Sequence, residues 1–109
     1  MEMKTIKFKH SLVKLILDGS KTTTWRLFDD KDIEVSDKLE FVEKESGKKF
    51  AKAEVVEVKE KKLREVEVAD FEGHESYENE EEMLRQYRIY YGDKVTGETV
   101  VKIIRFELL

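Results

Sequence analysis

Alternation of apolar and polar residues along the chain predicts five strands. Ile6 and Phe8 alternate with lysines, and Ala51, Ala53 and Val55 share one face of a later segment. The predicted strands cover residues 6–8, 22–28, 38–42, 50–58 and 99–108. Apolar residues at 63, 66 and 68 follow without a regular period, so this stretch is left unassigned.

A helical period appears in two places. Leu12, Leu15 and Ile16 share one helical face, Ser11 is a candidate N-cap, and Gly19 is suited to follow the helix end.

The second helix is predicted from Asn79 through Tyr91, with either Ser76 or Asn79 as its N-cap and Gly92 ending it. Its apolar stripe consists of Met83, Leu84, Tyr87 and Tyr91.

The resulting order is strand, helix, several strands, helix, strand. It lacks the regular strand–helix alternation of a doubly wound parallel sheet. We therefore expect an α+β fold, a mainly antiparallel, partly closed β-barrel with two flanking helices. The chain has 109 residues and contains no linker or repeat, so a single domain over 1–109 is expected.

Charge is distributed unevenly along the chain, which bears on the kind of ligand expected. Residues 1–26 carry six Lys or Arg and two acids, whereas residues 27–109 carry 15 basic and 23 acidic residues. A basic region on an acidic body suits a small anionic or nucleotide ligand better than a long duplex. A lysine-rich, solvated strand face is the simpler explanation for Lys4, Lys7 and Lys9.

The amino-acid composition excludes some kinds of site and bears on where the protein is found. With no cysteine, disulfides, zinc–thiolate sites and thiol nucleophiles are excluded. No segment has metal-ligand spacing, so we expect neither metal nor cofactor. No apolar run is long enough to span a membrane, and we expect a cytoplasmic monomer. The 42% of charged residues is typical either of a disordered chain or of a thermophile surface, and the regular apolar periodicity favours the thermophile surface.

The segment Gly19-x-Lys21-x-x-Thr24-x-Arg26 resembles the signature of the ASCH domain family. Val35-Ser36-Asp37 resembles the family's next turn, with Ser36 in place of the usual glycine, which leaves that turn's conformation open. The helix end at Tyr91-Gly92 and the closing strand extend the resemblance over nearly the whole chain. It implies a PUA-like fold and RNA-related ligands.

One bacterial branch of this family is more similar still, because Thr occupies position 24 where other members have Glu. Its members are small amidohydrolases that remove the acetyl group from N4-acetylcytidine. Their Lys, Thr and Glu triad corresponds to Lys21, Thr24 and Glu75. Glu75 is chosen by this resemblance alone; its neighbours Asp70, Glu72 and Glu78 are interpreted mostly as a solvated face.

These residue types also make chemical sense without the resemblance. Amide hydrolysis needs a nucleophile, a base that activates it and an acid for the leaving amine. A threonine hydroxyl, a desolvated lysine and a carboxylate supply these three roles. Arg26 can hold a carbonyl oxygen or phosphate, or instead pair with an acid such as Glu40. On a regular strand Thr24 and Arg26 share a face. Lys21 lies in the turn before the strand, so alternation does not fix whether it turns toward Thr24.

Other positions have two interpretations. His10 and Phe28 are candidate substrate-binding residues near the expected pocket, and His74 is interpreted as exposed. The aromatic residues Trp25, Tyr87, Tyr90 and Tyr91 are interpreted as core in preference to base-stacking surfaces.

The partner is expected to be a modified nucleoside or RNA. Besides hydrolysis, two functions stay open: a non-catalytic RNA-binding module, in which Lys4, Lys7, Lys9 and Lys14 contact phosphates, and RNA cleavage.

Overall fold

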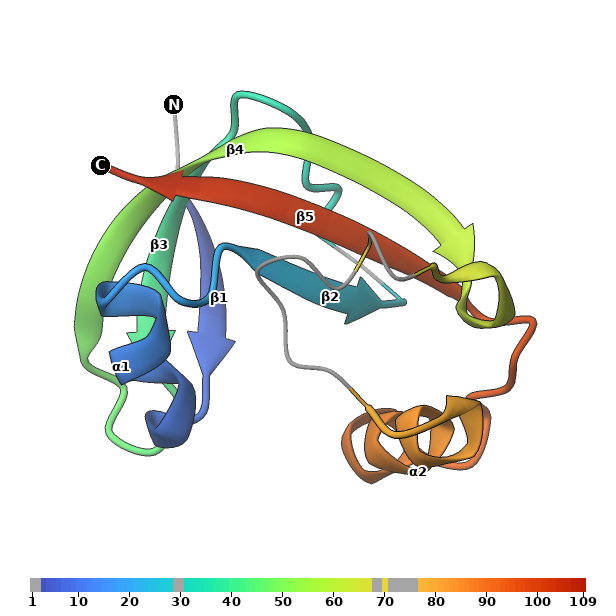
Figure 1. The fold of residues 1–109 in the computed structure, drawn as a ribbon. Coiled ribbons are helices and arrows are strands. Elements are labelled where there is room, and N and C mark those ends of the chain that lie inside the picture. Colours follow the sequence, from blue (N-terminus) through green and yellow to red (C-terminus); the bar gives the residue numbers. More distant parts are fainter. Residues whose placement is uncertain (1–2, 29–30, 68–69, 71–76) are drawn as a thin grey trace.

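Five strands form one curled sheet in the order β1-β3-β4-β5-β2 (Figure 1). The structure, a computed structural model, describes residues 3–28, 31–67, 70 and 77–109. The strands are β1 (Lys4–Phe8), β2 (Thr23–Leu27), β3 (Lys38–Glu43), β4 (Lys49–Lys62) and β5 (Val100–Leu108). Only the β1–β3 pair is parallel among the pairings of the described residues. The predicted α+β, mainly antiparallel and partly closed architecture is confirmed.

Strand β4 is longer than predicted. It continues four residues beyond Val58, to Lys62, because β5 pairs with it along that length, with Lys62 opposite Val100. A register shift between Val55 and Glu57 interrupts the pairing, and such irregularities increase the local bend of a sheet. The stretch after β4 begins with a 3-10 turn, η1 (Leu63–Glu65); Val68 lies outside the described residues.

Helix α1 (His10–Leu17) begins one residue before the predicted cap. The prediction that Ser11 caps it is wrong, because Lys9 is the N-cap residue and makes no side-chain capping bond. The Glu45 carboxylate instead accepts a hydrogen bond from the His10 backbone N–H at 3.0 Å. A residue 35 positions away therefore satisfies the first orphan donor of this helix.

Helix α2 (Glu80–Tyr91) follows its prediction closely. The Asn79 side chain accepts a hydrogen bond from the Glu82 backbone N–H at 2.8 Å, so Asn79 is the N-cap; Ser76 lies outside the described residues. Gly92 ends the helix with a φ of +93°, a conformation that favours glycine. Met83 and Tyr87 of the predicted stripe are buried.

The turn before β3 keeps a glycine-like backbone although it contains Ser36. The φ of Ser36 is +76°, in the left-handed region. The Ser36 N–H donates to the Val55 carbonyl at 2.8 Å, and the Val55 N–H donates to the Asp37 carbonyl at 2.9 Å. These bonds to β4 hold the conformation that glycine would adopt more readily.

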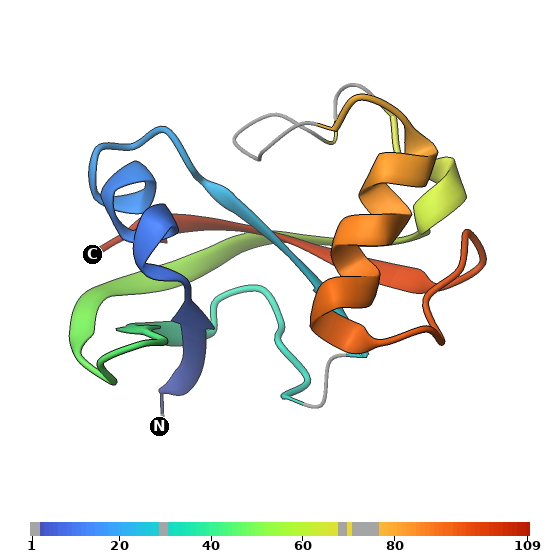
Figure 2. The same cartoon turned by 90° about the horizontal axis from the view of Figure 1, so that it is seen from below.

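Two apolar clusters form the core. One gathers around β1, β3 and α1, including Ile6, Ile16 and Phe41, and the other around β2 and α2, including Trp25 and Met83. Figure 1 shows β4 and β5 arching over the molecule, with α1 and α2 at opposite ends beneath the arch. Figure 2 shows the two helices separated by β2. β1 and β2 are the two edge strands of the sheet, and a groove lined by residues of both lies in the gap between them.

Candidate nucleoside-binding site

The signature segment links the end of α1 to the start of β2. Gly19 has a φ of +86°, and the Lys21 backbone N–H donates to the Leu15 carbonyl at 2.9 Å. These features turn the chain tightly back from the helix, so Lys21 precedes the strand and is not bound by strand alternation.

Lys21 points into the molecule. Its relative exposure is only 4%, and its Nζ donates to the Thr23 carbonyl at 2.8 Å. Burying an ammonium group is costly unless it is hydrogen-bonded. A lysine in such a position is therefore unlike the solvated lysines elsewhere on the chain.

Thr24 and Arg26 lie on the same face of β2, as strand alternation predicts. Arg26 Nε donates to Thr24 Oγ1 at 3.2 Å, and Arg26 Nη2 donates to the Lys7 carbonyl at 3.1 Å. The guanidinium carbon lies 5.0 Å from the centre of the Phe8 ring. Arg26 thus reaches across the gap between the edge strands. Glu40, its alternative partner, lies 3.3 Å from Lys49 Nζ.

A cavity of about 270 Å³ brings these side chains together. Pockets for drug-sized ligands have volumes of roughly 300–1,000 Å³, so this one, just below that range, suits a small molecule. The described residues that line it are Lys7, Phe8, Lys9, Leu12, Lys21, Thr24, Trp25, Arg26, Lys44, Tyr77, Tyr87, Tyr90 and Tyr91. The charged members of this set are all cations.

Aromatic rings form one wall of the cavity. Trp25 and Tyr87 are stacked, with ring centres 6.3 Å apart and an interplanar angle of 5°. Tyr87 and Tyr91 are also nearly parallel, at 6.3 Å and 22°. Trp25 and Tyr87 belong to the core as predicted, but both also face the cavity together with Tyr90 and Tyr91. Tyr90 is 48% exposed, so its interpretation as core is wrong. The helical spacing of the tyrosines in α2 indicated a buried stripe and did not reveal that they also line the cavity.

The third triad position, Glu75, lies outside the described residues, as do His74 and Glu72. Asp70 is described, and its side chain is 2% exposed. Burial raises the pKa of Asp70, but the Glu67 backbone N–H and the Lys61 ammonium group outweigh it and hold the pKa below its usual value. Asp70 is thus a buried, paired carboxylate and not part of a solvated face.

His10 and Phe28 do not belong to the described lining of this cavity. His10 is exposed at the start of α1, where its Nδ1 lies 2.7 Å from Glu43 Oε2. Phe28 follows the end of β2 and is 49% exposed. It lines an adjoining groove of about 480 Å³ between the edges of β1 and β2.

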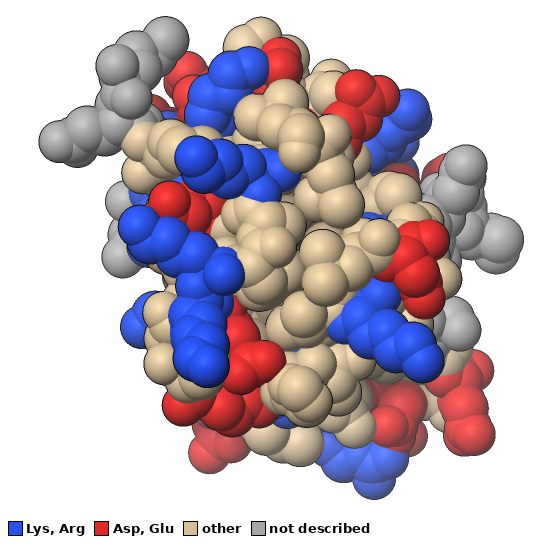
Figure 3. Space-filling view, turned by 90° about the vertical axis from the view of Figure 1, so that its left-hand side faces the viewer, with Lys and Arg blue, Asp and Glu red and all other residues tan. Residues whose placement is uncertain are grey.

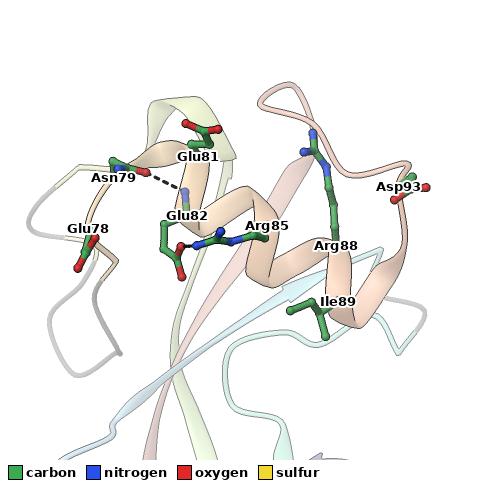
Figure 4. A pocket seen from close by; sticks show the side chains of 8 residues that line it. All are labelled: Glu78, Asn79, Glu81, Glu82, Arg85, Arg88, Ile89 and Asp93. Carbon is green, nitrogen blue, oxygen red and sulfur yellow. Dashed lines mark hydrogen bonds and ion pairs between the residues drawn. The ribbon is translucent and has the colours of Figure 1, made fainter.

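A larger hollow runs along the outward side of α2 (Figure 4). Glu82 pairs with Arg85 there, and Arg88 Nε donates to the Val95 carbonyl at 2.9 Å. Acidic side chains, among them Glu78, line it together with the two arginines. Its mixed charge gives no preference for an anionic ligand.

Charges of both signs also surround uncharged residues on the face shown in Figure 3. Within the described ranges, no group of three or more potential ligands could hold a metal ion, and no helix is long and apolar enough to cross a bilayer.

Comparison with known proteins supplies the family context. The sequence matches the family model of the ASCH domain over residues 3–109. A comparison with curated proteins gives no match.

Several solved structures share the fold. An ASCH domain from Lactobacillus crispatus is 13% identical, with a TM-score of 0.75 over 98% of this chain and 79% of that one. A protein from Enterococcus faecalis is 13% identical, with a TM-score of 0.80 over 100% and 82%. A protein from Pyrococcus furiosus, solved by NMR, is 26% identical, with a TM-score of 0.64 over 100% and 98%.

Proposed function

Because the chain belongs to the ASCH domain family, we propose that it is an amidohydrolase that removes the acyl group from N4-acetylcytidine or a related modified nucleoside. The observation that carries this proposal is the cavity shared by Lys21 and Thr24. It joins a buried amine, a buried hydroxyl and stacked aromatic rings in a volume that suits one nucleoside. If Lys21 and Thr24 were exposed to solvent, neither the amine nor the hydroxyl would be desolvated beside aromatic rings.

The proposed reaction begins at Thr24. Lys21 takes the proton of the Thr24 hydroxyl, whose oxygen attacks the acyl carbon. Burial of an amine disfavours its charged form, so a buried lysine can be neutral before the reaction. Its lone pair is then available to accept a proton. The bond between the acyl carbon and N4 then breaks as Glu75 protonates N4, which leaves cytidine and an acyl-threonine ester. Water then attacks the ester carbon, the bond to Thr24 Oγ1 breaks, and the acyl group leaves as a carboxylic acid (acetic acid from N4-acetylcytidine). Lys21 returns its proton to the Thr24 hydroxyl, and Glu75 regains a proton from the attacking water.

Arg26 is proposed to orient the substrate. Its fork of donors already bonds Thr24 Oγ1 and the Lys7 carbonyl, which places positive charge beside the proposed nucleophile. Negative charge that develops on the acyl oxygen is stabilised by donors fixed in this manner. The aromatic wall would stack on the base.

The test is a turnover assay with N4-acetylcytidine, in which cytidine and acetate are quantified. We expect Lys21→Met and Thr24→Val each to lower kcat/KM by about 10²-fold or more, as loss of a proton-transfer group or nucleophile does. Lys14→Met and Thr22→Val are matched controls outside the described cavity lining, and both should retain activity. Wild-type-like kcat/KM in Lys21→Met or Thr24→Val would contradict the mechanism.

A non-catalytic RNA-binding role is the second candidate, favoured by the cationic groove beside the cavity. It predicts salt-dependent RNA binding without turnover. If the wild-type protein leaves N4-acetylcytidine intact but binds RNA, this role replaces the first.

A further inference from the structure

The groove between the edges of β1 and β2 continues from the cavity. Lys7, Arg26 and Tyr91 line both hollows. The groove therefore adjoins the cavity, and the side chains at the junction include two cations. Arg26 and Lys7 lie between the two hollows and line each of them.

Phe28 presents an aromatic ring in this groove. The ring is 49% exposed and packs edge-on against Tyr91, with centres 5.9 Å apart and an interplanar angle of 65°. The φ of Phe28 is +52°, which is uncommon for a bulky residue. Strained backbone of this kind gathers at binding sites. This backbone conformation leaves the Phe28 ring about half exposed to solvent, although phenylalanine side chains are usually buried.

One cation lies over this ring, and others line the same groove. Lys94 Nζ lies 4.2 Å from the centre of the Phe28 ring, and Lys31, Lys7 and Arg26 also line the groove. Within the described lining there is no carboxylate. An exposed aromatic ring flanked by cations is the arrangement with which proteins bind single-stranded nucleic acid, since bases stack on the ring and cations hold the backbone.

We propose that this groove is a second nucleotide subsite, in which a base stacks on Phe28 while Lys94, Lys7 and Arg26 face the phosphates. The inference rests on the proposed function, in that the cavity takes the modified cytidine. It specifies the ligand further, as a single-stranded RNA segment in place of a free nucleoside.

The test uses ligands without an acyl group, so that binding is measured independently of turnover. We expect the trinucleotide uridylyl-cytidylyl-uridine to bind the wild-type protein at least about fivefold more tightly than cytidine, the lower end of the gain from stacking one base. Phe28→Ala and Lys94→Gln should each bring this affinity ratio toward one. Two variants are used because Phe28→Ala alone could disturb folding.

Ile89→Ala and Lys38→Gln are matched controls on exposed positions away from the groove, and they should keep the wild-type ratio. Equal affinities of the wild-type protein for cytidine and the trinucleotide would overturn the inference. A ratio that survives both Phe28→Ala and Lys94→Gln would also overturn it. Neither result touches the proposed amidohydrolase, which depends on turnover of N4-acetylcytidine.

Discussion

His10 and Glu43 form an ion pair at the start of α1, close to the rim of the cavity. The Glu43 carboxylate raises the pKa of His10, first through its hydrogen bond and then through its charge. A raised pKa means that the pair contributes to stability below the unfolded-state pKa of about 6.5. That contribution is lost as the pH rises through the pKa of the folded state.

This arrangement predicts the titration of a single side chain. We expect NMR titration to give a His10 pKa above about 6.5, and Glu43→Gln to lower it toward that value because the charge is removed. His10→Asn assigns the resonance. Glu40→Gln, which changes a carboxylate that faces Lys49, should leave the titration unchanged. A wild-type pKa at or below about 6.5 would contradict the pairing.

At the scale of elements, α2 connects the second core cluster to the cavity. Its buried side packs Met83 and Tyr87 into the cluster, and Tyr87, Tyr90 and Tyr91 reach the cavity. The stability of this helix therefore contributes both to the core and to the aromatic wall.

The N-cap of α2 gives a direct test. Asn79→Ala removes the acceptor for the Glu82 N–H, and we expect the free energy of unfolding to fall by about 0.5–2 kcal/mol. Asn79→Asp keeps an acceptor oxygen and should lose much less. Urea denaturation of the three proteins measures the difference. If Asn79→Ala and Asn79→Asp were equally stable, the cap would not contribute as the structure indicates.

How well sequence predicted each element depended on where its determinants lie. The caps of α2, Asn79 and Gly92, are adjacent to the helix and were visible as local signals. The start of α1 depends on Glu45, a distant residue in sequence, and was missed. The end of β4 was missed for the same reason, because pairing with β5 extends a charged segment that has little strand propensity of its own.

The site divides in a similar way. Strand alternation correctly placed Thr24 and Arg26 on one face. The burial of Lys21 could not be predicted from its residue type, since lysines are usually exposed. The proximity of the α2 tyrosines to Trp25 requires the tertiary fold. Sequence periodicity therefore favoured a core role over the cavity wall that they form.

At the scale of the whole molecule, cations are concentrated at the cavity and its adjoining groove, whereas the hollow along α2 also carries acidic side chains. The net charge is −4, yet the described charged residues that line the cavity and its adjoining groove are all Lys or Arg. Charges of both signs are mixed on the face in Figure 3. The attraction for a polyanion should therefore be local.

This charge distribution predicts a shallow salt dependence. For the trinucleotide, with two phosphates, we expect log Ka to fall against log salt with a slope of about −1.4. A 12-nucleotide RNA should give a slope no steeper than about −3, because the additional phosphates lie outside the groove. Isothermal titration calorimetry at several salt concentrations measures both slopes. A slope that steepens in proportion to RNA length would instead indicate a long basic surface.

The gap between β1 and β2 has a consequence for self-association. Edge strands offer unpaired backbone groups to which a strand from another molecule can add, and lysines on an edge hinder that addition. Arg26 joins the two edges through the Lys7 carbonyl, and Lys7 and Lys31 line the space between them. The same cations would repel a second copy of this sheet. We therefore expect that the open edges of the barrel do not promote aggregation by strand addition.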